Sequence, residues 1–222
     1  MSTVGLEARA RAYAALGDPS RLSMIDLLEN ADLASGELSS RLNMPTNLIA
    51  HHLRVLEGAG LIRRRRSEGD GRRTYVTRTD ACNDLLGAGR GARPHKVAFI
   101  CSQNSARSQL AESYWRTISD IPVVSGGTRP ARRVHPRAVT VGRRHGLDLT
   151  RARPRLAADV LGGDELLIAV CDRAYEDLDG TPLHWSIPDP ALAGNTDAFE
   201  GAYDDITGRI SRLVESFQGE PS

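Results

Sequence analysis

Over the first 60 residues, apolar side chains recur three or four positions apart in successive short segments, which is the spacing of amphipathic helices. The residues that mark the first two segments are Tyr13, Leu16, Leu22, Ile25 and Leu28. Between these segments, Asp18-Pro19 is a helix cap followed by a favourable first helical residue. Further helices are predicted over residues 35–42 and from Thr46 to about Glu57, the last closed by Gly58 and Gly60.

Residues 61–66 and 72–79 have strand character and flank the segment Ser67-Glu68-Gly69-Asp70-Gly71. Two short strands around a glycine-rich tip predict a β-hairpin. Helices followed by a hairpin in this order predict a mainly-α winged helix-turn-helix domain, and we place it at residues 1–86.

The pattern changes after residues 87–95, GAGRGARPH, which lack apolar periodicity and are predicted to be a linker. Strand-like runs at 97–100, 123–125, 166–170 and 183–185 then alternate with helices near 105–117, 136–145 and 198–217. This alternation predicts an α/β three-layer domain over residues 96–222, with a four-stranded parallel sheet covered on both faces. The last helix carries a core stripe at Phe199, Ala202, Ile206, Ile210, Leu213 and Phe217.

Charge separates the two parts more clearly than the formal net charge of +1 suggests. Residues 1–93 hold 14 Arg against 11 Asp and Glu, whereas residues 94–222 hold 15 Lys and Arg against 17. Within residues 61–78, seven arginines face only Glu68 and Asp70. The hairpin is therefore a candidate phosphate-contacting element, although an arginine run can also be an ordinary solvated surface.

The helix predicted to begin at Thr46 has the two faces that a DNA-recognition helix needs. Ile49, Leu53 and Leu56 form its inward stripe. The opposite side carries the candidate base and phosphate contacts Thr46, Asn47, Ala50, His51 and Arg54, and the hairpin adds Arg64, Arg66, Arg72 and Arg73. Double-stranded operator DNA is the expected partner, and a module that binds only protein is the alternative.

The segments ALGDPSRLSMIDLL, LNMPTNLIAHHLRVLEGAGLIRRRR and GRRTYV resemble the arsenical-resistance repressor (ArsR-type) family over about residues 6–80. The resemblance implies a homodimer that binds a palindromic operator and releases it when an inducer binds. Arsenite sensors of that family carry a cysteine pair on the helix before the recognition helix, where this chain has Ser35-Gly36-Glu37-Leu38-Ser39-Ser40. Arsenite sensing at that place is not expected, and no metal site is assigned to Cys82, His51 or His52.

Three cysteines, Cys82, Cys101 and Cys171, are too few and too unevenly spaced for a disulfide framework. No segment has the roughly 20 apolar residues of a membrane helix, and the amino-terminal segment lacks the apolar core of a secretory signal. We expect a cytoplasmic protein with reduced thiols and no membrane partner.

Cys101 directly follows a predicted strand, and Arg107 follows it at the start of a helix. Loop amides and a helix amino terminus bind an oxyanion and favour a thiolate, while an arginine grips two anion oxygens. We therefore expect Cys101 and Arg107 to be catalytic. The mechanism also needs an acid to protonate the departing oxygen, and Asp189 in HWSIPDPA is the catalytic candidate, although an Asp between two prolines can also be an ordinary turn residue. The expected oxyanion cradle is Ser102, Gln103, Asn104, Ser105, Ala106, Arg107 and Ser108, with Asn104 suited to a left-handed conformation and Ser108 a donor to the thiolate.

The segments CSQNSARSQLAES, SGGTRPARRVHPRAV, HGLDL, LLIAVCDRA and HWSIPDP resemble the low-molecular-weight tyrosine phosphatase superfamily, and its arsenate reductase branch in particular, over about residues 96–217. The resemblance implies Cys101 as nucleophile and Asp189 as general acid. Phosphotyrosine-specific members carry tyrosines after the acid, where this chain has Pro190-Ala191-Leu192. The difference favours a small oxyanion such as arsenate.

Reduction of arsenate requires an electron donor after Cys101 forms its arsenic adduct. Cys171 resembles the first relay cysteine of the thioredoxin-linked branch, but Leu178 stands where a second would lie. No tightly bound cofactor is expected. An external thiol (glutathione, mycothiol or the thioredoxin system) supplies the electrons, or Cys171 resolves Cys101 directly, or turnover has been lost and the domain only senses.

The combined prediction is an arsenic-responsive transcriptional regulator fused to a thiol-dependent arsenate reductase, an oxidoreductase of arsenical resistance. Two alternatives stay open: a tyrosine phosphatase tethered to DNA, and a catalytically silent repressor that senses oxyanion or redox state.

Overall fold

The computed structural model describes residues 5–87, 89, 91–180 and 182–218. These residues form two compact units, one comprising residues up to Ser67 with Gly71–Gly89, the other comprising residues from 91 onward with Glu68–Asp70. Residues 88 and 90 of the predicted linker lie outside the described residues, as do residues 1–4, 181 and 219–222. The predicted boundaries 1–86, 87–95 and 96–222 stay a prediction. Among the described residues, no helix has both the length and the apolar character needed to cross a membrane.

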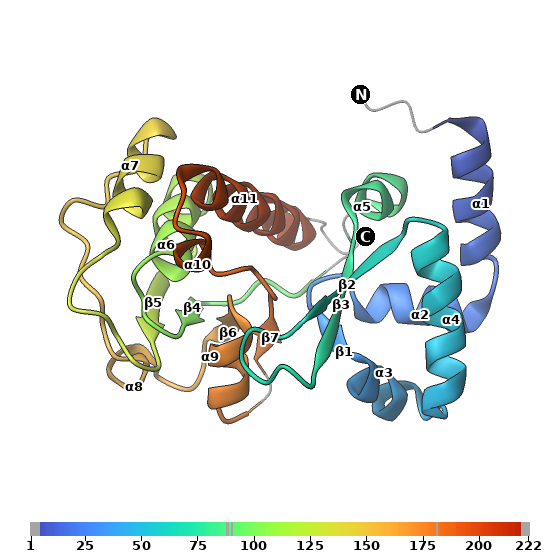
Figure 1. Cartoon of the computed structure of the whole chain (residues 1–222). Helices are drawn as coiled ribbons and strands as arrows, with labels where there is room; N and C mark the ends of the chain where they lie inside the picture. Colours follow the sequence, from blue (N-terminus) through green and yellow to red (C-terminus); the bar gives the residue numbers. More distant parts are fainter. Residues whose placement is uncertain (1–4, 88, 90, 181, 219–222) are drawn as a thin grey trace. The chain divides into compact units, whose positions relative to one another are not determined.

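The first unit is a winged helix with helices around one small antiparallel sheet (Figure 1). Its helices are α1 (Leu6–Leu16), α2 (Pro19–Leu27), α3 (Ser35–Leu42), α4 (Thr46–Gly58) and α5 (Asp80–Leu86). Its strands are β1 (Leu33–Ala34), β2 (Ile62–Arg66) and β3 (Thr74–Arg78), in the order β1-β3-β2. The predicted helices and hairpin are confirmed, and α5 and β1 are additions.

Local capping sets where these helices begin and end. Asp18 Oδ1 accepts the main-chain N–H of Arg21 at 3.0 Å, and Pro19 is the first residue of α2, as predicted. Gly58 was expected to close α4, but it is the last helical residue, and Gly60 supplies the positive φ of 74° just after it. The predicted inward residues of α4, Ile49, Leu53 and Leu56, are all fully buried in the core.

The second unit contains a four-stranded sheet in which all strand pairs are parallel, which confirms the predicted sheet. Its strands are β4 (Val97–Cys101), β5 (Val123–Gly127), β6 (Leu166–Ala169) and β7 (Leu183–His184), in the order β5-β4-β6-β7. Its helices are α6 (Arg107–Ile118), α7 (Pro136–Arg144), α8 (Ala157–Val160), α9 (Asp172–Asp177), α10 (Pro190–Ala193) and α11 (Thr196–Gln218). The short helices α8, α9 and α10 were not predicted.

Helices cover both faces of this sheet, with α6 and α11 side by side on one face and α8 and α9 on the other (Figure 1). The predicted stripe of α11 is core, since Phe199, Ile206 and Ile210 are fully buried. Strand β4 lies between β5 and β6, and all five of its residues are buried. The carboxyl ends of such central parallel strands form the usual ligand-binding edge, and Cys101 lies at this end of β4.

Candidate active site

The loop from Cys101 to Arg107 joins the central strand β4 to helix α6 and curls around the Cys101 thiol. Asn104 has a φ of 48°, the left-handed conformation expected for it, and its main-chain N–H donates to Cys101 Sγ at 3.0 Å. Ser108 Oγ lies 3.0 Å from the same sulfur. The loop and the first turn of α6 thus supply the sulfur with two hydrogen-bonding groups.

The carbonyl groups of the loop are held on its outer side by the segment that follows β5. The N–H groups of Thr128, Arg129, Ala131 and His135 donate to the carbonyls of Cys101, Ser102, Gln103 and Ser105 at 3.1, 2.7, 2.9 and 2.8 Å. With these carbonyls turned outward, loop N–H groups are left to face the sulfur and any anion bound there.

Gly127, the last residue of β5, is required for this close approach. A Cβ atom at position 127 would lie 2.9 Å from both Asn104 N and Ser102 O, which are main-chain atoms that cannot move aside. Glycine at position 127 therefore allows the main chain of β5 to pack directly against the main chain of the loop.

The Arg107 guanidinium is buried beside the loop and paired with Asp189. Its Nη2 lies 2.9 Å from Asp189 Oδ2, and its Nη1 donates to the Ile187 carbonyl at 2.8 Å. Burial works to lower the pKa of Arg107, but the negative charges of Cys171, Cys101 and Asp189 outweigh it and raise that pKa. Asp189 also caps α10, because its Oδ1 accepts the N–H of Ala191 at 3.0 Å. The structure thus brings Arg107 and Asp189 together near Cys101.

Cys171 lies next to Cys101 at the carboxyl end of β6, the strand adjacent to β4. Val170 N donates to the Ile100 carbonyl at 2.7 Å. The residues that follow these two, Cys171 and Cys101, therefore lie side by side at this edge of the sheet. Both thiols are free and buried. Burial raises the pKa of Cys171 to about 11 against the lowering effect of Arg107, with a further rise from the nearby Cys101 charge.

The remaining cradle residues are placed around this loop. Ser102, Asn104, Ala106 and Ser108 are buried, Ser105 is half-buried, and Gln103 is exposed. The catalytic and oxyanion-binding roles of these residues, of Cys101, Arg107 and Asp189, and of Cys171 stay predictions.

The candidate DNA contacts lie mainly on exposed surface of the first unit. Thr46, Asn47, Ala50, His51 and Arg54 are exposed on α4, and Arg66, Arg72 and Arg73 are exposed on the hairpin. Arg64 differs, because it is half-buried and its Nη2 lies 3.1 Å from Glu57 Oε2. These DNA contacts also stay predictions.

Within the described parts of the chain, no group of three or more His, Cys, Asp and Glu side chains is arranged to hold a metal ion. Cys82 is buried in the core of the first unit. The rings of His51 and His52 contact each other edge to face at 5.6 Å, and His52 Nδ1 lies 3.9 Å from Asp18 Oδ1.

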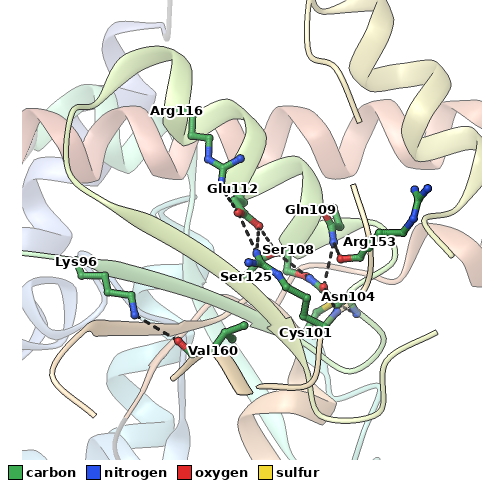
Figure 2. Close-up of polar contacts among 11 residues, drawn as sticks. Lys96, Cys101, Asn104, Ser108, Gln109, Glu112, Arg116, Ser125, Arg153 and Val160 are labelled. Carbon is green, nitrogen blue, oxygen red and sulfur yellow. Dashed lines mark hydrogen bonds and ion pairs between the residues drawn. The ribbon is translucent and has the colours of Figure 1, made fainter. Parts of the chain in front are cut away.

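Sequence reasoning missed the polar residues Glu112, Ser125 and Arg155, which lie behind the loop and connect to the predicted cradle residues Asn104 and Ser108 (Figure 2). Asn104 Nδ2 donates to Ser108 and Ser125, Ser125 contacts Glu112, and Arg155 Nη2 donates to both Glu112 oxygens at 3.0 and 2.7 Å. No local pattern in the sequence marks Glu112, because helical spacing puts it outside the apolar stripe of Leu110, Ala111, Tyr114 and Trp115.

Residues 96–222 match the family described as low molecular weight phosphotyrosine protein phosphatase, and the chain belongs to this family. Residues 18–64 match the arsR family of bacterial regulatory proteins. The second unit is similar to arsenate reductases of Bacillus licheniformis, 30% identical over 132 residues, and of Bacillus subtilis, 28% identical over 133 residues. Each alignment covers 54% of this chain and 95% of the relative. A crystal structure of an arsenate reductase from Archaeoglobus fulgidus aligns with 54% of this chain and 98% of its own, at 26% identity and a TM-score of 0.47.

Proposed function

We propose that this chain is an arsenic-responsive DNA-binding repressor joined to a thiol-dependent arsenate reductase. The observation that carries the enzymatic half is the buried Cys101 thiol, contacted by Asn104 N–H and Ser108 at 3.0 Å, beside the Arg107–Asp189 pair. A nucleophile, an anion clamp and an acid are what attack on a tetrahedral oxyanion requires.

In the proposed first step, the Cys101 thiolate attacks the arsenic of arsenate and a sulfur–arsenic bond forms. The hydroxyl group of hydrogen arsenate takes a proton from Asp189 and leaves as water. Arg107 and the loop N–H groups hold the remaining oxygens, where negative charge develops. In the second step, another thiolate attacks Cys101 Sγ. A disulfide forms and the sulfur–arsenic bond breaks, and its electron pair stays on arsenic, which leaves as arsenite.

We propose that an external low-molecular-weight thiol provides the second sulfur. The Cys171 thiol has a pKa of about 11 because it is buried, so little of it is thiolate near neutral pH. A cavity of about 640 Å³ lies beside the loop, lined by Gln103, Ser105, Ala131, Arg133, Val134, His135, Pro136 and Arg137. The exposed arginines at 133 and 137 give this cavity a positive rim suited to a thiol that carries carboxylates, such as glutathione.

Arsenate is favoured over a phosphotyrosine side chain because no aromatic residue follows the acid. Pro190, Ala191 and Leu192 are the first three residues of α10, directly after Asp189, and Leu192 is 69% exposed. This surface offers no ring to stack against a substrate phenol.

The regulatory half of the proposal rests on the exposed polar face of α4 and on the arginines of the hairpin. The first unit binds a palindromic operator as a homodimer in the cytoplasm, with α4 in the major groove and Arg66, Arg72 and Arg73 at the backbone. An inducer releases the operator only if it binds the DNA-free form more tightly. Gel-shift titrations with arsenite, arsenate and the oxidised protein test this coupling, and unchanged operator affinity under all three contradicts it.

The enzymatic half is tested with the purified full chain. Three reducing systems are assayed separately: glutathione with its redoxin, mycothiol with its redoxin, and the thioredoxin system. We expect at least one of them to support the production of arsenite from arsenate. Hydrolysis of an aryl phosphate is measured in parallel. Rapid hydrolysis of the aryl phosphate without arsenate reduction would instead identify a phosphatase. If the protein shows neither activity but releases DNA when arsenate is added, it is a sensor.

A further inference from the structure

His52 lies on the buried side of α4, although it can carry a charge. Only 7% of the residue is exposed, and it shares that side of the helix with Leu53 and Leu56, whereas its neighbour His51 is exposed. Helix α4 packs there against α1, α2 and α3 (Figure 1). A polar ring in such a place needs a hydrogen-bond partner.

The Nδ1 atom of His52 is buried and has no hydrogen-bond partner among the residues that the structure describes. It lies 3.9 Å from Asp18 Oδ1, which is too far for a hydrogen bond. Asp18 Oδ1 caps α2 by accepting the main-chain N–H of Arg21 at 3.0 Å, so the carboxylate is held in place. A shift of the ring by about 1 Å would bring the two atoms within hydrogen-bonding distance.

Asp18 is charged throughout the pH range in which histidine titrates. The main-chain N–H of Arg21 is the main cause that lowers the pKa of the Asp18 carboxyl, against partial desolvation, and the charges of Arg21 and His52 lower it further. A carboxylate only accepts hydrogen bonds, so His52 has to carry a proton on Nδ1 to bond to it. Neutral imidazole holds its single proton on either nitrogen, whereas the protonated ring always offers an Nδ1–H together with a positive charge.

The charged groups of α1 and α2 near this contact act in both directions. From α2, the Arg21 guanidinium lies 3.7 Å from Asp18 Oδ2 and disfavours a second positive charge, as the amino end of the helix does. From α1, the Ala15 carbonyl accepts from Arg21 Nε, so the partly negative carboxyl end of α1 is close by and favours a positive ring. Arg11 of α1 lines a cavity against Val55, one turn further along α4.

Charged side chains on the other neighbours of α4 have partners of their own or face solvent. From α3, Glu37 accepts a main-chain N–H at 2.6 Å, and Arg41 is exposed. From β2, Arg64 is paired with Glu57 in the last turn of α4. Asp18 is thus the acid on which a contact of the protonated ring depends.

We propose that His52 is a positioning residue for DNA binding: its protonated ring donates from Nδ1 to Asp18 and holds α4 against the start of α2. The inference rests on the proposed binding of DNA by the first unit. DNA phosphates beside α4 add a negative potential, which favours the protonated ring. Because linkage is reciprocal, protonation of His52 then strengthens DNA binding, so the affinity rises as the pH falls through the range of histidine.

The readout is the affinity of the full chain for a fluorescent DNA duplex, measured by anisotropy at constant ionic strength from about pH 8 to about pH 6. The duplex is one that the parent protein selects from a random-sequence pool. We expect the parent affinity to rise roughly 10-fold over this range, the effect of one hydrogen bond to a charged group. A parent affinity that does not change with pH overturns the proposal and leaves DNA binding intact. If the parent selects no duplex, DNA binding itself is wrong and this inference falls with it.

Two single variants test the contact from its two sides. His52→Gln keeps an N–H that can reach Asp18 but takes up no proton in this range, so we expect its affinity to vary little with pH. Asp18→Asn keeps an oxygen that can cap α2 but removes the negative charge, and it should flatten the profile in the same way. Because the two residues act as a pair, the double variant should have the profile of either single variant. A profile as steep as that of the parent in either single variant overturns the proposal.

His51→Gln is the matched control, since it removes an exposed imidazole from the adjacent position of the same helix. Its affinity for the duplex falls if His51 contacts DNA, but we expect most of the pH dependence to remain. A flat profile in His51→Gln beside a steep one in His52→Gln would assign the proton uptake to the exposed ring and overturn the proposal.

Discussion

Arg107 and Asp189 form an ion pair with 2.9 Å between Nη2 and Oδ2, and their side chains are only 6% and 22% exposed. The two residues proposed to bind the oxyanion and to protonate its leaving oxygen therefore contact each other directly. An oxyanion that enters the loop has to attract the same guanidinium. Asp189 and the bound anion thus compete for Arg107.

The competition predicts opposite effects of Asp189→Asn on binding and on turnover. The neutral amide removes the charged partner of Arg107 Nη2, while Nη1 still donates to the Ile187 carbonyl, so phosphate should protect Cys101 from alkylation at several-fold lower concentration. Turnover should fall by about 100-fold or more, because the proton donor is gone. Steady-state arsenate reduction and phosphate protection give the two values, and weaker phosphate protection would contradict the competition.

Cys101→Ser should separate the two activities of the chain. A serine hydroxyl is a far weaker nucleophile than a thiolate, so arsenate reduction should fall by at least about 1,000-fold. Operator affinity in a gel shift should be unchanged in the absence of arsenic. Cys82→Ala is the control, because Cys82 lies in the core of the first unit and the variant should reduce arsenate like the parent.

Cys171→Ala should retain most of the arsenate reductase activity with an external thiol near neutral pH. The reason is that the buried Cys171 thiol, with a pKa of about 11, is a poor nucleophile under these conditions. The measurement is arsenite production by parent and variant at equal thiol concentration. Complete loss of turnover in a folded Cys171→Ala protein would show that Cys171 resolves Cys101 directly.

The raised pKa of Cys171 also predicts a pH dependence of stability. In the unfolded chain a cysteine titrates near about 8.5, so the folded state resists ionisation of Cys171 up to about 11. The contribution of the neutral Cys171 thiol to stability is complete below the pKa that Cys171 has in the unfolded chain. It is lost as the pH rises through the higher pKa that Cys171 has in the folded chain. The free energy of unfolding should fall by up to roughly 3 kcal/mol across this window, and urea unfolding of Cys171→Ala should lack that part of the fall.

DNA binding should depend differently on two neighbouring arginines of β2. Arg66→Ala should weaken binding to all sequences and reduce the salt dependence by about one counterion, as expected for a phosphate contact. Arg64→Ala should have the smaller effect, because the Arg64 guanidinium is already paired with Glu57. Equilibrium binding at several salt concentrations measures both, and a larger salt effect for Arg64 than for Arg66 would reverse the assignment.

Long helices in which apolar residues recur every three or four positions could be predicted from the sequence. The buried Ile49, Leu53 and Leu56 of α4 and the stripe of α11 are examples, because helical spacing alone places such residues on one face. The short elements β1, α9 and α10 could not be predicted, since two to six residues contain too little of any period.

The candidate site shows the same division. Local sequence places Cys101, Asn104 and Arg107 on one strand–loop–helix segment, and this part could be predicted. The contacts of Ser125 with Asn104 and of Arg155 with Glu112 join residues 21 and 43 positions apart, so they depend on how the sheet and the helix pack. The requirement for glycine at position 127 likewise emerges only where β5 crosses the loop.

The outward carbonyls of the loop, fixed by the segment from Thr128 to His135, mean that folding itself orders the cradle. Little of the free energy gained from an arriving anion is then consumed in arranging the loop, and only the Arg107–Asp189 pair has to adjust. Occupancy can therefore follow the surrounding oxyanion concentration promptly, a property that serves a detector as well as it serves a catalyst.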